Sequence, residues 1–204
     1  MPAASSTSLV TAISSFDQLR LRARELGPKR IAVVVADDDV ALLAAASAVQ
    51  LGIAIPILFG DEAKIRAEIA RVHASALLAQ ATFVNAADPA AAANAAAQMA
   101  RDGHVDILLK GHLRTDQLLK AVLDKANGLR TGRLLSDVLL YEDTLAGYPR
   151  LVGVTDGGIN VLPTLDHKKQ IVQNAISAFH ALGFARPKIA IMSATEVEIG
   201  RAHV

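Results

Sequence analysis

The amino-acid sequence predicts an α/β fold built from two α/β units. Short apolar runs alternate with stretches of helical pattern from residue 30 to residue 111, which is the order expected of strands joined by helices. The run RIAVVVA (Arg30 to Ala36) is apolar without interruption and rich in β-branched residues, as in a strand covered on both faces. After Gly132 two apolar runs follow each other with only a short turn between them. We therefore expect a parallel sheet in the first unit and a boundary near Gly132.

The first unit is expected to alternate four strands with three helices. Asp37 to Asp39 can cap the helix after the first strand and favour its positive end, and Gly52 ends that helix. Asp88 can cap a later Ala-rich helix that has Pro89 in its first turn. Strands in this order are parallel, with right-handed crossovers. After Ala36 we predict a helix in 37–52, a strand in 53–60, a helix in 61–73, a strand in 81–86, a helix in 88–103 and a strand in 105–111.

The second unit is expected to hold an antiparallel or mixed strand pair and a long helix. The apolar runs 134–143 and 150–156 are separated by the turn sequence TLAGYP. Residues 165–184 place apolar side chains on one helical face, and KIAIMSA (188–194) is a final strand. We assign residues 1–132 to the first unit and residues 133–197 to the second.

The composition excludes several classes of function. The 204 residues carry a net charge of only +1 and no Trp, which argues against nucleic-acid binding and base stacking. The absence of Cys excludes disulfides, thiolate catalysis and zinc–sulfur sites, and the six His form no i, i+4 metal pair. No apolar run approaches the ~20 residues of a membrane span, and the N-terminal stretch is a poor signal peptide. We expect a cytoplasmic protein that binds neither membrane nor nucleic acid and holds no metal.

The first candidate site is the basic stretch from Leu108 to Arg133. It begins where a predicted strand ends in Lys110-Gly111 and leads into a helix, and it holds six cations against two acids. Ligands in open α/β sheets bind beyond the carboxyl ends of strands, and helix N-terminal amides attract phosphate. The stretch therefore suits an anion such as a phosphorylated cofactor. The alternative is a helix face whose charges are simply solvated.

The second candidate site is the segment VTDGGINVLPTLDHK (154–168). Thr155 and Asp156 follow an apolar strand, two glycines allow a tight turn, and Asn160 comes next, so a polar group could orient a substrate. The alternative is a turn followed by a helix cap at Thr164 or Asp166.

Two familiar nucleotide-binding signatures are missing. The sequence contains neither GxxxxGK[ST] nor a GxGxxG loop after Val35, where it reads ADDDV instead. Three carboxylates at that place would repel a pyrophosphate, which disfavours a Rossmann dehydrogenase.

Four motifs occur in one order between Asp106 and Glu196: Lys110-Gly111, LRTG (129–132), TDGGIN (155–160) and DHKKQIVQNA (166–175). In this combination, with SDV at 136–138, the segment resembles the phosphate acetyltransferase/phosphate butyryltransferase family. The resemblance implies reversible acyl transfer between acyl phosphate and coenzyme A, by direct attack of the thiol on the acyl carbonyl. It implies coenzyme A as a substrate, no bound cofactor, and a homo-oligomer when the protein is complete. It also implies a two-domain architecture like that of isocitrate/isopropylmalate dehydrogenases, with the active site in the cleft between domains.

The resemblance also assigns residues to this site. Asp156 and Asn160 are expected to line the cleft. Lys120 falls where the family commonly has Arg, and an ammonium cannot form a bidentate fork. The residues expected to bind acyl phosphate, phosphate and the phosphates of coenzyme A are Lys110, Thr115, Lys120, Arg130, Thr131 and Arg133.

The main catalytic residues of the family are a Ser-Arg dipeptide and a nearby Asp, in a later segment with no counterpart in this sequence. We therefore expect a copy shortened at its C-terminus and inactive by itself. EIGRAHV (198–204) is also what a common sequencing adapter encodes in frame, so we expect a non-native tail without a chemical role. Two other functions stay open. One is a catalytically silent module that binds coenzyme A or phosphate, and the other is a dehydrogenase of the isocitrate/isopropylmalate type, for which the metal-binding aspartates and nicotinamide contacts are not evident.

Overall fold

The computed structural model describes residues 12–145 and 147–192 of the chain. These residues divide into two compact units, one formed by Phe16–Arg133 and the other by residues 134–192 together with residues 12–15. The division therefore falls between Arg133 and Leu134, one residue beyond the position taken from the sequence. Residues 12–15 group with the second unit, whereas the sequence prediction assigned them to the first.

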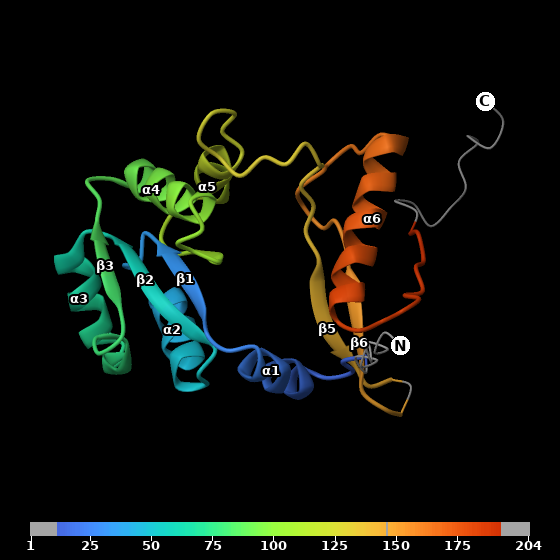
Figure 1. The fold of residues 1–204 in the computed structure, drawn as a ribbon, viewed down its shortest axis with the longest axis horizontal. Coiled ribbons are helices and arrows are strands. Elements are labelled where there is room, and N and C mark those ends of the chain that lie inside the picture. The colour runs from blue at the N-terminus through green and yellow to red at the C-terminus, as the bar shows by residue number, and fades with distance from the viewer. Residues whose placement is uncertain (1–11, 146, 193–204) are drawn as a thin grey trace, which may run out of the picture. The chain divides into compact units, whose positions relative to one another are not determined.

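The first unit is built on a four-stranded parallel sheet with the order β3-β2-β1-β4 (Figure 1). The register places Val34 at the end of β1 opposite Phe59 of β2 and Lys110 of β4. The predicted alternation of four strands with helices is thus confirmed, and the parallel direction follows from the helical crossovers. The strands are β1 (Lys29–Val34), β2 (Ala54–Gly60), β3 (Thr82–Asn85) and β4 (Ile107–Lys110).

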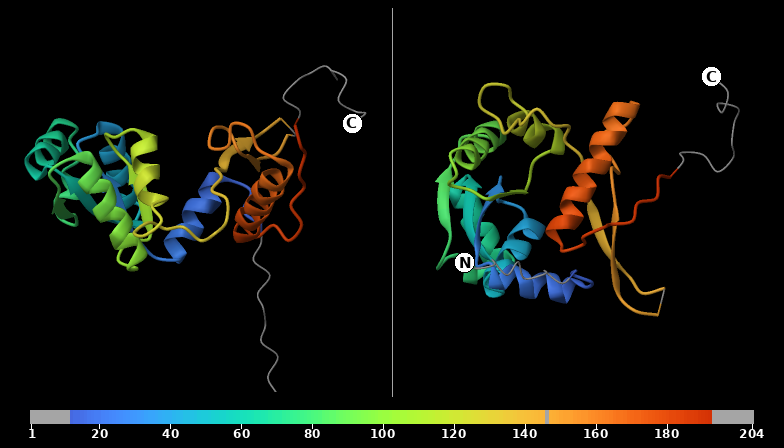
Figure 2. Two further views of the ribbon diagram at one scale, coloured as in Figure 1. Left: turned by 90° about the horizontal axis from the view of Figure 1, so that it is seen from above. Right: turned by 45° about the vertical axis from the view of Figure 1, so that its right-hand side comes forward.

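Helices cover both faces of this sheet (Figure 2). Val33 and Leu58 pack with α2 and α3, whereas Ala32 and Val34 point to the other face and pack with α4 and α5. Because side chains alternate along a strand, β1 must be apolar at every position to serve both layers. The helices of this unit are α1 (Phe16–Glu25), α2 (Asp39–Gln50), α3 (Glu62–Arg71), α4 (Pro89–Arg101) and α5 (Thr115–Val122), with a 3₁₀ turn at Ser75–Leu77.

Aspartates begin three of these helices. Asp38, Asp61 and Asp88 are the N-caps of α2, α3 and α4, and each side chain accepts a hydrogen bond from a backbone N–H of the first turn. Such bonds satisfy amide groups that have no partner inside the helix. The sequence predicted the caps of α2 and α4 correctly, and it predicted the stop at Gly52, which has a φ of 72°.

Asp38→Ala should lower the free energy of unfolding of the first unit by about 1 kcal/mol, because the bond from the Ala41 N–H (2.8 Å) is lost. Urea unfolding followed by circular dichroism measures the change. Asp17→Ala is the matched control, since the Asp17 side chain is 91% exposed, is not a cap residue, and forms only a surface ion pair with Arg20. Equal losses for the two variants would contradict the assignment of the cap.

The second unit pairs a β-hairpin with one helix. β5 (Leu139–Asp143) and β6 (Arg150–Val154) are antiparallel, and α6 (Leu165–Ala181) follows them. A Cβ atom at Gly153 would lie 2.6 Å from the ring of Phe179, so α6 packs directly on the backbone of β6. Thr164 is the N-cap of α6, and its hydroxyl accepts a hydrogen bond from the His167 N–H. The predicted strand pair and long helix are confirmed.

The structure differs from the sequence prediction at two places. Residues 188–192 of the expected final strand KIAIMSA form no strand, and the rest of that segment lies outside the described residues, as does the 198–204 tail. Neither of the two sheets in the described ranges contains residues 188–192, and a strand forms only where a neighbouring strand pairs with its backbone groups. Helix α1 was not predicted, because it buries no residue and instead carries the i, i+3 ion pairs Arg20–Asp17 and Arg22–Glu25.

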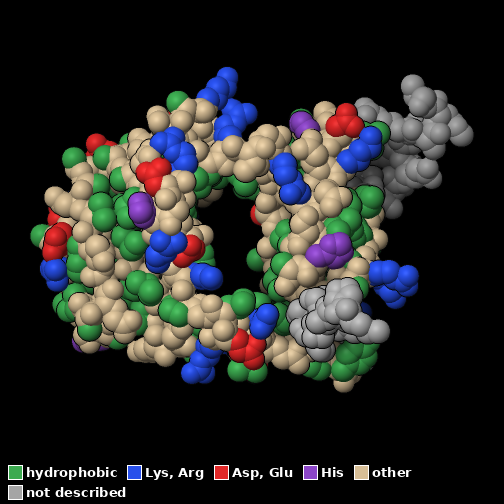
Figure 3. Space-filling view, viewed as in Figure 1, with side chains coloured by type: hydrophobic (Ala, Val, Ile, Leu, Met, Phe, Trp, Pro, Cys, Tyr) green, Lys and Arg blue, Asp and Glu red, His purple; other side chains and the backbone are tan. Residues whose placement is uncertain are grey.

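Lys and Arg side chains are scattered among acidic and apolar ones on the face that Figure 3 shows. None of the helices in the described ranges is both long and apolar enough to span a bilayer.

Candidate functional site

The strand order of the first unit reverses between β1 and β4, which makes this position the topological switch point of the sheet. From β1 the chain moves outward to β2 and β3, and then crosses back to place β4 on the other side of β1. The carboxyl ends of β1 and β4 therefore diverge into loops that lead to helices on opposite faces. Open α/β sheets bind ligands at such a switch point. Lys110, the last residue of β4, lies there opposite Val34.

Backbone hydrogen bonds join the loops that follow these two strands. The Gly111 N–H donates to the Val34 carbonyl at 2.9 Å, and the His112 N–H donates to the Val35 carbonyl at 2.8 Å. The β4–α5 loop thus continues the sheet for two residues beyond Lys110. This arrangement holds the loop against the end of β1.

The ammonium of Lys110 is held by its own loop. Its Nζ donates to the carbonyl of Leu113 at 3.0 Å and to the carbonyl of Gly111 at 3.3 Å. An ammonium has three N–H donors, so these two bonds leave one donor and the full positive charge for a ligand. The arrangement fits an anion-binding lysine that is fixed in place before its ligand arrives.

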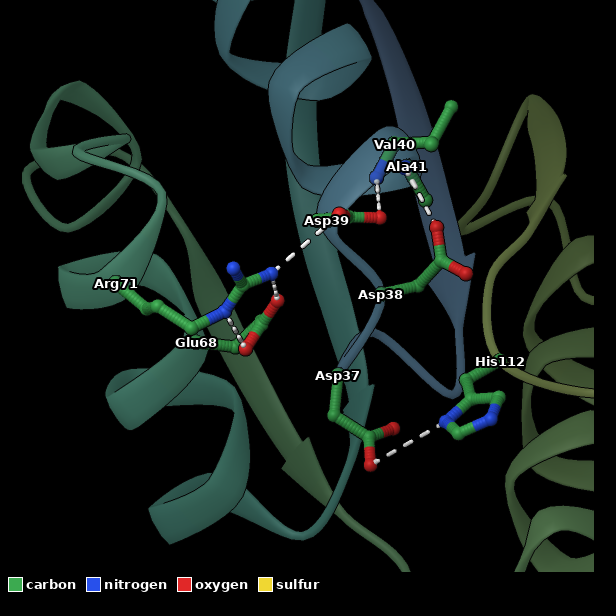
Figure 4. Close-up of polar contacts among 8 residues, drawn as sticks. All are labelled: Asp37, Asp38, Asp39, Val40, Ala41, Glu68, Arg71 and His112. Carbon is green, nitrogen blue, oxygen red and sulfur yellow. Dashed lines mark hydrogen bonds and ion pairs between the residues drawn. The ribbon is translucent and has the colours of Figure 1, made fainter.

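Three carboxylates follow β1, and Figure 4 shows that Asp37 faces His112 of the β4–α5 loop whereas Asp39 faces Arg71 of α3. Asp37 Oδ2 is 4.0 Å from Nδ1 of His112, and Asp38 caps α2. Asp39 accepts from the Val40 N–H and forms an ion pair with Arg71 at 3.4 Å. These negative charges surround the N-terminus of α2, which would otherwise attract phosphate. An anion at the switch point is therefore favoured on the β4 side.

Thr115 begins α5 on that side and is exposed. Its neighbour Arg114 donates to Asp116 at 2.9 Å, and this hydrogen bond with the charge of Arg114 holds the pKa of Asp116 below its usual value. Gln117 accepts from the Arg114 N–H and closes the first turn. The structure therefore brings Lys110 and Thr115 to one strand–helix junction, as the sequence predicted for a ligand-binding position.

The remaining basic candidates lie farther along the chain. Lys120 occupies the last turn of α5, where its Nζ is 4.0 Å from Asp116 and its side chain is 80% exposed. Arg130, Thr131 and Arg133 are exposed in the segment that ends the first unit. They follow a loop ordered by Asp124, whose carboxylate accepts from the Ala126 and Asn127 N–H groups. These four residues remain predicted ligands.

The second unit brings Asp156 and Asn160 into direct contact. The Asn160 side-chain amide donates to the Asp156 carboxylate, which also accepts from the Ile159 N–H at 3.0 Å. Asn160 donates in addition to the Leu135 carbonyl at 2.9 Å. Burial of the Asp156 carboxyl raises its pKa, but these hydrogen bonds outweigh it and hold the pKa below its ordinary value. Asp156 is thus a carboxylate that fixes the glycine turn.

The lowered pKa of Asp156 predicts an acid-sensitive contribution to stability. The unfolded state binds the proton more tightly, so the contribution is present above about pH 4 and is lost as the pH falls through the folded-state pKa. Asp156→Asn should flatten this part of the curve, and Asn160→Ala should weaken it. Urea unfolding at several pH values measures the effect. An unchanged acid slope in Asp156→Asn would show that Asp156 does not cause it.

Asp137 belongs to the same cluster and was missed as a site residue. Its carbonyl accepts from the Thr155 hydroxyl at 2.6 Å, and its carboxylate accepts from the Gly157 N–H at 2.9 Å. The pairing of Leu139 with Val154, extended by two residues, places Asp137 opposite Asp156. The sequence predicted an antiparallel or mixed pair without a register, so it did not place Asp137 in this cluster. Asp37 and His112 were likewise not assigned, because only the β1–β4 pairing brings them together.

No three His, Cys, Asp or Glu side chains gather as a metal site anywhere in residues 12–145 or 147–192.

The chain is similar in sequence to proteins of one known family. Residues 81–203 match the sequence profile of the family described as phosphate acetyl/butaryl transferase. The chain is 37% identical to the phosphate acetyltransferase of Rhizobium meliloti over 183 residues, which are 90% of this chain and 57% of that protein. It is 34% identical to the phosphate butyryltransferase of Clostridium beijerinckii over 183 residues, 90% of this chain and 59% of that protein.

A solved structure shows the same fold. The crystal structure of a branched-chain phosphotransacylase from Enterococcus faecalis V583 matches 83% of this chain and 57% of its own chain, with a TM-score of 0.67 and 24% sequence identity. The chain spans somewhat more than half the length of each of these proteins. Since the family profile covers well over half of the sequence, the chain belongs to the phosphate acetyl/butyryl transferase family.

Proposed function

We propose that the chain serves reversible acyl transfer between an acyl phosphate, acetyl or butyryl phosphate, and coenzyme A. The observation that carries the proposal is the position of Lys110 at the switch point of the sheet, fixed by its loop beside the first residue of α5. Membership of the family supports the proposed reaction, and the position of Lys110 supports a phosphate site beside it. Anions and helix N-terminal amides attract each other, and a fixed ammonium adds to that attraction.

The chemistry of the transfer explains why fixed cations are useful. The sulfur of coenzyme A attacks the acyl carbonyl carbon, the carbon–oxygen bond to phosphate breaks, and phosphate leaves with the electron pair. The thiol proton is released and is accepted by the phosphate product, so charge and atoms balance. Negative charge develops on the carbonyl oxygen and on the departing phosphate. Preorganised cations aimed at these atoms stabilise the transition state by several kcal/mol in comparable sites.

We assign the binding of acyl phosphate, phosphate and coenzyme A phosphates to Lys110, Thr115, Lys120, Arg130, Thr131 and Arg133. Asp156 and Asn160 are proposed to line the substrate site, where their mutual hydrogen bond would hold the glycine turn. The proposal includes coenzyme A as a substrate with no bound cofactor, a cytoplasmic location, a homo-oligomer of the complete protein, and the two-domain architecture of isocitrate/isopropylmalate dehydrogenases.

We further propose that these 204 residues bind substrate without turnover, because the Ser, Arg and Asp that the family resemblance makes catalytic have no counterpart in this sequence. The alternative, a catalytically silent module that binds coenzyme A, also predicts binding without turnover by these 204 residues. The two hypotheses differ for a chain extended to the length of its relatives, which should turn over substrate only under the first. Release of phosphate from acetyl and butyryl phosphate in the presence of coenzyme A tests both. The assay compares this chain with a version extended to the length of its relatives.

Turnover by the extended protein alone is the expected result. Turnover by the 204-residue chain would refute the proposal that essential groups are missing from it. Binding of coenzyme A without turnover by either protein would favour the silent module.

A further inference from the structure

The residue that follows β1 has an unusual backbone conformation. Val35 has a φ of 57°, in the left-handed region, and its side chain is buried. A β-branched residue is disfavoured there because its Cβ crowds the following carbonyl. Such a conformation persists only where the surrounding structure holds it in place.

Hydrogen bonds on both sides hold this conformation. The Ala36 N–H donates to the Phe59 carbonyl at 2.9 Å, which ties the residue after Val35 to β2. The Val35 carbonyl itself accepts from the His112 N–H at 2.8 Å, which ties it to the β4–α5 loop. The turn of the backbone at Val35 thus directs its carbonyl toward β4, where it becomes the support for the lysine loop.

Gly111 makes this support possible. A Cβ atom at Gly111 would lie 2.1 Å from the Val35 carbonyl oxygen and 2.8 Å from that of Val34. Both neighbours are backbone atoms of the central strand and its extension, so they cannot move aside as a flexible side chain would. Gly111 is needed here for space, since no residue with a side chain can approach the carbonyls this closely.

The loop seated on this support carries Lys110. Its other end is anchored by Leu113, which is buried in the same core cluster as Val35. The two carbonyls that accept from the Lys110 ammonium belong to Gly111 and Leu113, the residues at these two anchors. A shift of either anchor would therefore move the acceptors that hold the ammonium.

We infer that Val35 and Gly111 are positioning residues for anion binding by Lys110, an inference that rests on the proposed function. As positioning residues they act through the loop and not by contact with the ligand. Their role is to fix the Lys110–Leu113 loop, with the constrained carbonyl of Val35 as the support and the missing side chain of Gly111 as the space for close approach.

Gly111→Ala tests the inference, with titration of coenzyme A by calorimetry and amide hydrogen exchange of His112 as readouts. The variant should bind coenzyme A about tenfold more weakly and exchange the His112 amide faster, since the loop is displaced from Val35. Gly103→Ala is the matched control. A side chain at Gly103 would be strained by the φ of 76°, but Gly103 precedes β4, at the end opposite Lys110, and a Cβ atom there would meet no neighbour within 4 Å. The Gly103→Ala protein should lose thermal stability and keep its affinity for coenzyme A.

A Gly111→Ala protein that binds coenzyme A as tightly as the unmodified chain would overturn the inference and leave the proposed function intact. Failure of the unmodified chain to bind coenzyme A would overturn the proposed function and the inference with it. If Gly111→Ala does not fold, Val35→Gly replaces it. Glycine adopts a positive φ without strain, but it also populates many other conformations and removes the buried side chain that anchors this position in the core. Faster His112 exchange and about threefold weaker binding are therefore expected, and an unchanged value of either would overturn the inference.

Discussion

Phe59→Ala should lower the free energy of unfolding of the first unit by about 3 to 5 kcal/mol. Phe59 is among the largest side chains that are fully buried in the described residues, and it packs between β2 and the layer of α4 and α5. The loss combines the transfer of the ring to water with the cavity left in the core. It is a large share of the ~5–15 kcal/mol that holds an ordinary domain together. Urea unfolding monitored by circular dichroism measures it.

The matched control for this change is Phe83→Ala. Phe83 lies on the outer strand β3, is only partly buried, and has the guanidinium of Arg66 4.1 Å from its ring centre. Its loss should be clearly smaller, because the site can fill with water. Equal losses at the two positions would mean that the core of the first unit does not lie where the sheet and the two helix layers place it.

Gly128→Ala should destabilise the loop that precedes the basic segment by about 1 to 3 kcal/mol. A Cβ atom at Gly128 would lie 2.5 Å from the Val122 carbonyl oxygen and 2.6 Å from that of Asp124. The loop would have to open, which would break the bond from the Leu129 N–H to Val122 (2.7 Å). Amide exchange of Leu129 and thermal unfolding measure the effect, and binding of coenzyme A should weaken if Arg130 and Arg133 contact it.

Asn127→Ala is the control for the same loop. The Asn127 side chain is exposed, and its backbone N–H still donates to Asp124 after the substitution. Stability and exchange should stay close to those of the unmodified chain. A Gly128→Ala protein as stable as this control would show that the close backbone approach at Gly128 is not required.

Local patterns predicted the elements of the first unit because each is determined by nearby residues. The uninterrupted apolar run of β1, the cap at Asp88 with Pro89 behind it, and the stop at Gly52 need only their neighbours to be recognised. The same reasoning placed Lys110 at the end of a strand before a helix. Helix α1 was not predicted by this reasoning, because it has exposed ion pairs and buries no apolar face.

Contacts between distant segments explain what the sequence did not predict. The left-handed conformation of Val35 depends on bonds to Phe59 and His112, which are 24 and 77 residues away along the chain. Asp137 joins the Asp156 cluster only through the register of β5 and β6. Residues 188–192 have the composition of a strand, but composition does not supply a pairing partner.

The central claim is that Lys110 at the switch point of the sheet binds the anionic part of the substrate. Calorimetric titration of coenzyme A into the 204-residue chain and its Lys110→Met variant tests it most directly, with Lys64→Met, an exposed lysine of α3, as the control. We predict that Lys110→Met weakens binding about tenfold or more, because a hydrogen bond to a charged group is lost, and that Lys64→Met leaves it unchanged. Equal affinity of the Lys110→Met variant and the unmodified chain would contradict the claim.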